Sequence, residues 1–232
     1  MVQRHWRYRL HRPILWLRQQ EPILLLACLL VIVSTWAFIE LADEVGQGET
    51  QQFDVWAVAL LRHPQQPALP RGPQWLAEAG RDITALGSNP VLVLLVAAVA
   101  GLLCLQGQYK TTALVLLATL SGLVLMLLLK HIFDRPRPDF LSHLPTMTQS
   151  FPSGHSMLAA VVYLSLGALL AQREPVRRIK AYFLCVALGV TFLVGSSRVY
   201  LGVHYPTDVL AGWTVGLAWA LVWWLVARYM RR

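Results

Sequence analysis

Charged residues and cysteines are scarce in this sequence. Of its 232 residues only 14% are charged and three are Cys, whereas 56% are hydrophobic. Such a composition excludes an ordinary soluble domain. Because Cys28, Cys104 and Cys185 all lie inside apolar runs, we expect buried thiols that pack as small hydrophobic groups, and neither a disulfide framework nor a metal site.

Apolar runs that can cross a hydrocarbon core of about 30 Å occur six times. They lie at residues 22–42, 86–106, 112–129, 156–171, 181–197 and 207–227. The pattern predicts an all-α fold, a bundle of six transmembrane helices that forms one domain over residues 22–232. The fourth and fifth runs are short, so we expect flanking residues to lengthen these helices, or the lipid beside them to thin.

The longest connection between runs, residues 43–85, contains several Gly and Pro residues that break helices. Large apolar residues nevertheless recur at helical spacing around Asp54, and these are Phe53, Trp56, Leu60 and Leu61. This spacing predicts a short interfacial helix over 52–62, and a second is expected over 74–82. The alternative is an irregular loop that caps the bundle.

Lysine and arginine are divided unequally between the two sides that six spans define. Thirteen of the 20 cations lie before the first run, in the second and fourth connections or after the last run, and seven lie elsewhere. By the positive-inside rule, both termini are cytoplasmic, and the connections after the first, third and fifth runs are external. We therefore expect a multi-pass plasma-membrane protein whose residues 1–21 form a basic cytoplasmic tail, with 43–85 outside.

The formal net charge of +8 is explained by this topology. The basic residues are scattered among the membrane connections, without a basic domain interleaved with aromatic residues, so nucleic acid is not an expected partner. The oligomeric state stays open at this point.

The polar stretch from Ser197 to Asp208 joins two apolar runs and contains a cation, an imidazole and a carboxylate. His204 and Asp208 are four residues apart, so a helix that starts near Pro206 would turn the carboxylate toward the imidazole ring. A carboxylate on one ring nitrogen leaves the other nitrogen with a free lone pair, which makes His204 a candidate nucleophile. Taken alone, this stretch is equally compatible with interfacial polar residues at a membrane surface.

Two further polar segments are predicted on the same external side. One runs from Lys130 to Pro138 after the third run, and the other, residues 152–155, is Pro-Ser-Gly-His at the start of the fourth. Ser153 before an apolar helix predicts an N-cap, with helix amides directed at an anion. Gly154 would let the backbone approach that anion closely.

Cations from these segments can bind a phosphate group. Lys130 offers a compact charge, and Arg137 and Arg198 offer planar forks that suit pairs of phosphoryl oxygens. Together they can balance a phosphate dianion and the charge that spreads over its oxygens during transfer, so we expect no metal or other cofactor. The alternative is that Lys130 extends toward the membrane interface and Arg137 binds lipid headgroups.

The three segments together resemble the signature of the type 2 phosphatidic acid phosphatase family. Lys-x6-Arg-Pro covers residues 130–138, Pro-Ser-Gly-His covers 152–155, and Ser-Arg-x5-His-x3-Asp covers 197–208, in the family's order and spacing. The resemblance implies a bacterial integral-membrane lipid phosphatase, similar to undecaprenyl-diphosphate phosphatases. The substrate would be undecaprenyl diphosphate, phosphatidylglycerol phosphate or phosphatidic acid. The distribution of cations and the parity of the spans, rather than the resemblance, predict an active site at the outer face of the membrane.

The resemblance and the chemistry imply the same roles. His204 attacks phosphorus to form a phosphohistidine, Asp208 orients His204, and His155 donates a proton to the leaving oxygen. The expected phosphate-binding residues are Lys130, Arg137, Ser153, Gly154 and Arg198. Two alternatives remain, a lipid phosphotransferase with the same intermediate, and a lipid transporter or scrambler that uses intramembrane cations without chemistry.

The remaining polar residues near the first motif, and the Trp residues of the last run, are expected to have structural roles. Asp134, Arg135 and Asp139 are expected first to solvate their loop and only secondarily to tune the site. The Trp residues of the last run are expected to pack against lipid and to form an interfacial belt, and they are Trp213, Trp219, Trp223 and Trp224.

Overall fold

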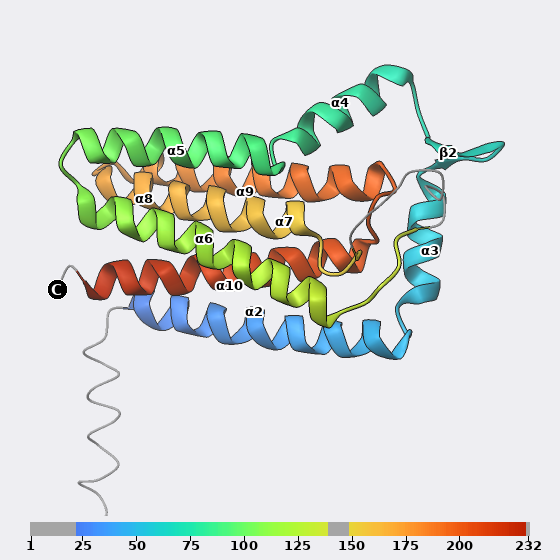
Figure 1. The fold of residues 1–232 in the computed structure, drawn as a ribbon, viewed down its shortest axis with the longest axis horizontal. Helices are drawn as coiled ribbons and strands as arrows, with labels where there is room; N and C mark the ends of the chain where they lie inside the picture. The colour runs from blue at the N-terminus through green and yellow to red at the C-terminus, as the bar shows by residue number, and fades with distance from the viewer. Residues whose placement is uncertain (1–21, 139–148, 231–232) are drawn as a thin grey trace, which may run out of the picture.

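The structure is a computed structural model that describes residues 22–138 and 149–230 (Figure 1). The predicted cytoplasmic tail, residues 1–21, lies outside the described residues, as does Asp139. In chain order the elements are α2 (Pro22–Gln47), α3 (Gln51–Leu60), β1 (Arg62–His63), β2 (Gln66–Pro70), α4 (Gln74–Ala85), α5 (Asn89–Leu105), α6 (Tyr109–Ile132), α7 (Gly154–Ala159), a π-helical turn (Ala160–Leu164), α8 (Ser165–Arg173), α9 (Arg177–Tyr200) and α10 (Pro206–Tyr229).

The predicted bundle of membrane-spanning helices is confirmed. Among the described residues, five helices are long and apolar enough to cross a membrane: α2, α6, α9, α10 and the continuous helix Gly154–Arg173, which comprises α7, the π-helical turn and α8. The sixth candidate span is a pair, α4 with α5, bent by 46° at the break between them. The protein is therefore a multi-pass integral membrane protein.

Flanking residues lengthen the two short runs, as predicted. The fourth run extends to 20 residues because its helix begins at Gly154, and the fifth extends to 24 because α9 continues through the polar residues up to Tyr200. α10 starts at Pro206, where a fixed φ suits the first helical turn and no backbone donor is lost. Polar motif residues thus occupy helix ends.

Small residues bring α7 and α10 into close contact. A Cβ added at Gly212 would lie 2.8 Å from the carbonyl oxygen of Ser153, and one at Gly216 would lie 2.5 Å from Ala160 Cβ. The Ser153 backbone N–H also donates to the Asp208 carbonyl at 2.9 Å. The N-termini of the two helices are therefore held together, and these termini carry two of the three motifs.

The connection 43–85 is ordered and largely helical. α3, which overlaps the predicted range 52–62 and begins one residue before it, crosses the end of the bundle, and α4 leads from the β1–β2 hairpin into α5 (Figure 1). The antiparallel hairpin is a departure from the all-α prediction. Buried Arg62 donates to the backbone carbonyls of Tyr200 and Leu201, which ties the connection to the C-terminal end of α9.

The prediction of buried thiols is wrong. Cys28, Cys104 and Cys185 are all exposed on the outside of the bundle, where apolar neighbours would be lipid. Conversely, two of the tryptophans that were expected to face lipid are in contact with other helices. Trp213 Nε1 donates to the Thr191 carbonyl at 3.1 Å, and Trp219 Nε1 donates to the Ala118 carbonyl at 3.2 Å.

Candidate active site

All eight predicted site residues lie at one end of the bundle. They come from the end of α6, the segment after it, the start of α7, the end of α9, the connection that follows it and the start of α10, at the end opposite the C-terminus (Figure 1). The residues are Lys130, Arg137, Ser153, Gly154, His155, Arg198, His204 and Asp208. The structure therefore brings the three motifs together.

His204 and Asp208 form the buried centre of this site. Their exposed fractions are 1% and 0%, and His204 Nδ1 lies 3.4 Å from Asp208 Oδ2. The same carboxylate oxygen accepts the Tyr205 backbone N–H at 2.9 Å and the Ser150 hydroxyl. Because the Nδ1 side of the ring faces Asp208, the opposite nitrogen, Nε2, is the one left for a substrate.

The environment of His204 favours a neutral imidazole. Burial lowers the pKa of His204 to about 4, against the opposing effect of its hydrogen bond and charge interaction with Asp208; Arg198 and Arg137 lower it further. A neutral imidazole keeps the lone pair that nucleophilic attack needs. At neutral pH His204 is thus in the form that the predicted role requires.

The start of α7 has the predicted cap. The Ser153 side chain accepts the Ser156 backbone N–H at 3.5 Å and the Ser156 hydroxyl at 2.9 Å. Gly154 lies beside the third helix of the site, since an added Cβ would be 3.4 Å from Lys130 Cε and 3.3 Å from Met126 Sδ. A methyl group at this position would be tight against Met126 and in contact with Lys130.

The three predicted phosphate-binding cations are partly held by neutral groups. Lys130 Nζ donates to the Gln149 carbonyl at 2.6 Å, and Arg137 donates to the Val203 carbonyl at 3.0 Å. Arg198 donates to Thr84 Oγ1 at 3.1 Å, while its buried Nε has no hydrogen-bond partner among the described residues.

These cations are close enough to His155 for their charges to act on it. Burial lowers the pKa of Arg137, although nearby Asp208 opposes the change. A cluster of like charges at a buried site is unfavourable without an anion. The arrangement therefore suits a bound phosphate.

The interpretation of Arg135 as a loop-solvating residue is wrong. Its guanidinium bridges two buried carboxylates, with Nη2 2.6 Å from Asp54 Oδ2 and Nη1 2.7 Å from Asp208 Oδ1. Arg135 Nη1 also donates to Thr207 Oγ1 at 2.8 Å. Asp134, by contrast, is exposed, as loop solvation requires.

Sequence reasoning missed Asp54, Thr207 and Ser150 as members of this network. A carboxylate among apolar residues on the helical face of α3 was the available signal for Asp54. No signal identified Ser150, since its contact with Asp208 bridges 58 positions of sequence. Within residues 22–138 and 149–230, no three His, Cys, Asp or Glu side chains lie together in a way that could hold a metal ion.

Comparisons with known proteins agree with the motifs. Residues 111–232 match the PAP2 superfamily. Phosphatidylglycerophosphatase B of Bacillus subtilis is 36% identical over 162 residues, which are 69% of this chain and 75% of that protein. An undecaprenyl-diphosphatase of Sulfolobus acidocaldarius is 32% identical over 84 residues, 36% of each chain.

A solved structure extends the similarity to the whole bundle. The crystal structure of a transmembrane PAP2-type phosphatidylglycerolphosphate phosphatase from Bacillus subtilis superposes with a TM-score of 0.76 and 31% identity, covering 87% of this chain and 98% of that one. The family match and the fold thus agree over both the motifs and the spans. The chain belongs to the PAP2 superfamily, the type 2 phosphatidic acid phosphatases that its motifs resemble, and is a membrane lipid phosphatase of that family.

Proposed function

We propose that this lipid phosphatase hydrolyses phosphatidylglycerol phosphate through a phosphohistidine on His204, without a metal ion. The observation that carries the proposal is the buried His204–Asp208 pair, whose Nδ1 side is occupied while three cations lie around the site. The choice of substrate is supported by the relative named phosphatidylglycerophosphatase B, of which the chain covers 75%. Undecaprenyl diphosphate and phosphatidic acid are the other candidates.

In the first step, His204 Nε2 attacks phosphorus and forms a P–N bond while the bond from phosphorus to the lipid oxygen breaks. His155 gives its proton to that oxygen, which leaves as a hydroxyl group of the lipid. Asp208 accepts a hydrogen bond from Nδ1–H and stabilises the cationic ring of the phosphohistidine. Lys130, Arg137 and Arg198, with the capped N-terminus of α7, stabilise the charge on the phosphoryl oxygens.

In the second step, water attacks the phosphoryl group and the P–N bond breaks. His155, now neutral, accepts the proton of the water, and His204 returns to its neutral form. The unpartnered Arg198 Nε supports a site for phosphoryl oxygen. Inorganic phosphate then leaves, and both imidazoles are in their starting states.

A panel of lipid phosphates tests the proposal. Purified enzyme would be assayed for released phosphate with phosphatidylglycerol phosphate, undecaprenyl diphosphate and phosphatidic acid, with and without excess EDTA. We expect phosphatidylglycerol phosphate to give the highest kcat/KM, with EDTA having no effect and vanadate inhibiting. Activity that disappears with EDTA and returns with Mg²⁺ would contradict the metal-free mechanism. Phosphate found on an added acceptor lipid instead of in solution would indicate a phosphotransferase.

We also propose that the site faces the extracytoplasmic side. Thirteen of the 20 cations precede the first span, follow the last or lie in the second and fourth connections, against seven elsewhere, of which three are assigned to phosphate binding. Among the thirteen, Lys110, Arg173 and Arg177 lie at helix ends opposite the site (Figure 1). Positive charge marks the cytoplasmic end of a membrane bundle. This arrangement supports cytoplasmic termini and a site that meets lipids of the outer leaflet.

Cysteine labelling in intact cells tests the orientation. In a variant whose three native cysteines are replaced by Ala, Gln65→Cys lies in the exposed turn between β1 and β2, and Gln106→Cys lies in the exposed turn between α5 and α6. A membrane-impermeant maleimide should label the first in intact cells and the second only after lysis. The reverse pattern would place the site in the cytoplasm.

A further inference from the structure

Asp54 is a buried carboxylate far in sequence from the three motifs. It lies on α3, in the connection that crosses the end of the bundle, and its exposed fraction is 0%. Its Oδ2 accepts the Thr207 hydroxyl at 2.5 Å, and its Oδ1 accepts the Thr207 backbone N–H at 3.2 Å. Asp54 therefore holds the first turn of α10, one residue before Asp208.

Arg135 connects Asp54 to the catalytic pair. Its two terminal nitrogens lie 2.6 Å from Asp54 and 2.7 Å from Asp208, and its guanidinium carbon lies 4.4 Å from the centre of the Tyr205 ring. Contacts on three sides hold the planar group in one orientation. The chain of contacts runs from Asp54 through Arg135 to Asp208 and His204.

Along this series of contacts, from Asp54 through Arg135 to Asp208, the negative charges outnumber the positive charge. Two carboxylates share one guanidinium, which leaves one negative charge in excess beside His204. Lys130 and Arg137 also act on Asp208, and Arg198 acts on His204. Without Asp54, the charge of Arg135 would act on Asp208 unopposed at the moment when His204 becomes cationic, and in a buried site that is unfavourable.

We propose that Asp54 is a positioning residue for phosphoryl transfer. It holds Arg135 and Thr207, and thereby Asp208, against His204, and its charge keeps Arg135 from neutralising Asp208 completely. In this view α3 is part of the catalytic machinery rather than a cap on the bundle. The inference rests on the proposed role of His204 as nucleophile.

The test uses purified full-length enzyme in detergent with dioctanoyl phosphatidic acid as the probe. The variants are Asp54→Asn, Arg135→Gln and the double variant, and the matched control is Asp43→Asn, an exposed carboxylate on α2. We expect Asp54→Asn to lower kcat about 10- to 100-fold, as loss of a group that orients a functional imidazole does elsewhere. KM should stay within about 3-fold, because the phosphate-binding cations are untouched.

The double variant separates charge from packing. Asp54→Asn removes one negative charge and Arg135→Gln removes one positive charge, so the double variant has the net charge of the wild type. We expect its kcat to exceed that of either single variant. A purely structural role predicts that the second substitution adds damage, so a double variant no better than the worse single variant would overturn the proposal.

A further variant covers the case in which Arg135→Gln does not fold, as its melting temperature would show. Thr207→Val removes a hydroxyl contact of Asp54 but keeps every charge, so its kcat should fall less than that of Asp54→Asn. A larger fall for Thr207→Val, or an Asp54→Asn variant within twofold of Asp43→Asn, would overturn the inference. Absence of acid-labile phosphohistidine in the wild type would instead overturn the proposed function, since that result does not depend on the variants.

Discussion

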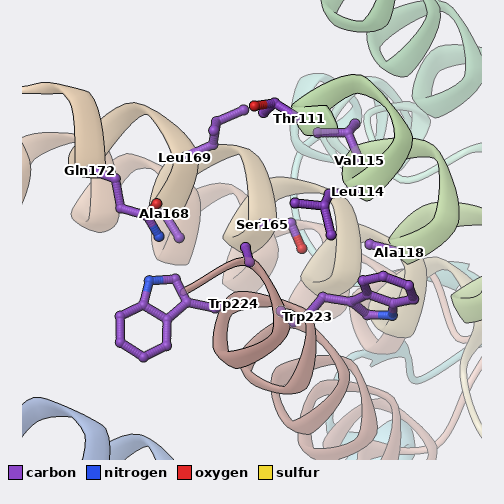
Figure 2. A pocket seen from close by; sticks show the side chains of 12 residues that line it. Thr111, Leu114, Val115, Ala118, Ser165, Ala168, Leu169, Gln172, Trp223 and Trp224 are labelled. Carbon is purple, nitrogen blue, oxygen red and sulfur yellow. The ribbon is translucent and has the colours of Figure 1, made fainter. Parts of the chain in front are cut away.

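Two regions at opposite ends of the helical bundle differ in the hydrogen bonding of their buried polar atoms. At the site end, Asp54 and Asp208 are fully buried, and each accepts several hydrogen bonds. At the other end, α6, α8 and α10 surround a small pocket (Figure 2) whose lining includes Ser165 and Trp223. Ser165 Oγ and Trp223 Nε1 are buried there without a hydrogen-bond partner among the described residues.

A buried donor without a hydrogen-bond partner indicates a ligand site in one of these regions and not in the other. Among the site residues the unpartnered atom is Arg198 Nε, which belongs to a cation among other cations, an arrangement that an anion completes. In the pocket of Figure 2 the unpartnered atoms, Ser165 Oγ and Trp223 Nε1, are neutral and lie beside Leu114, Val115 and Ala118. The charge of the group therefore distinguishes the anion-binding site from this pocket, and activity should depend on the site only.

The largest expected effect is that of His204→Ala. Because no other atom can replace Nε2 in the attack on phosphorus, we expect kcat to fall by about 1,000-fold or more. A melting curve close to that of the wild type would show that the fold persists. Rapid quenching of the wild type with ³²P-labelled lipid phosphate should trap acid-labile phosphate on His204, and label on a different residue would contradict the nucleophile assignment.

His155→Ala should show a loss that depends on the leaving group. A lipid alkoxide needs a proton to depart, so its hydrolysis should slow by about 100-fold or more, the typical contribution of a general acid. p-Nitrophenolate leaves without a proton, and its release should slow far less. Paired assays of the two substrates measure the difference, and equal losses would exclude the general-acid role.

At mildly acidic pH, the neutral fraction of His204 should be about ten times that of an ordinary histidine. At pH 5.5 a side chain with a pKa of about 6.5 is roughly one-tenth neutral, whereas His204, with a pKa of about 4, should be almost wholly neutral. ¹⁵N NMR of histidine-labelled protein, assigned with His204→Gln, measures this fraction. A midpoint near 6.5 would contradict the burial argument.

The lowered pKa of His204 also predicts that the folded protein loses stability as the pH falls. Because the folded-state pKa of His204 is about 4 and the unfolded value is about 6.5, the unfolded chain binds more protons between them. The contribution of neutral His204 to stability is therefore complete above pH 6.5 and is lost as the pH falls toward 4. Melting temperatures across this range should fall less in His204→Gln than in the wild type, by the part that His204 contributes.

Gly87→Ala should disturb the site from the break between α4 and α5. An added Cβ would lie 2.4 Å from Val194 Cγ1 and 3.2 Å from the His155 carbonyl oxygen. Displacing His155 by a fraction of an ångström should lower kcat by about 3- to 10-fold. Gly101→Ala on α5 is the control, because no atom lies within 4 Å of its added Cβ; equal activity in the two variants would contradict the predicted displacement.

Local patterns predicted the elements and groups that neighbours in sequence determine. The His204–Asp208 contact and the Ser153 cap follow from spacings of four and three residues on a helix. The contact between Arg135 and Asp54 joins positions 81 apart, and nothing in either segment indicates its partner. The sequence alone therefore predicts a solvent-exposed Arg135.

The same limit explains the errors in burial. Which side of an apolar helix faces its neighbours depends on packing between helices, and a helix that is apolar all round gives no signal for it. For this reason the sequence does not predict that Cys28, Cys104 and Cys185 are exposed, or that Trp213 and Trp219 lie between helices. The short β1–β2 hairpin lies in a Pro-containing segment without the alternation typical of strands.

The smallest effect is expected at the pocket of Figure 2, and a pair of serines gives the comparison. Ser150→Ala removes a fully buried hydroxyl that donates to Asp208 and lies 3.4 Å from His204 Nδ1. Asp208 would lose one of its hydrogen bonds, so we expect kcat to fall by about 10-fold, equivalent to about 1.4 kcal/mol.

Ser165→Ala removes the same atom from a site where it has no hydrogen-bond partner among the described residues. Activity should stay within about twofold, and the melting temperature should be unchanged or higher, because removing an unsatisfied buried hydroxyl relieves a desolvation penalty of about 1 kcal/mol. Enzyme kinetics and thermal unfolding of the two variants, purified together, measure both quantities. A loss of activity in Ser165→Ala as large as that in Ser150→Ala would show that the two ends are coupled, and that the pocket contributes to turnover.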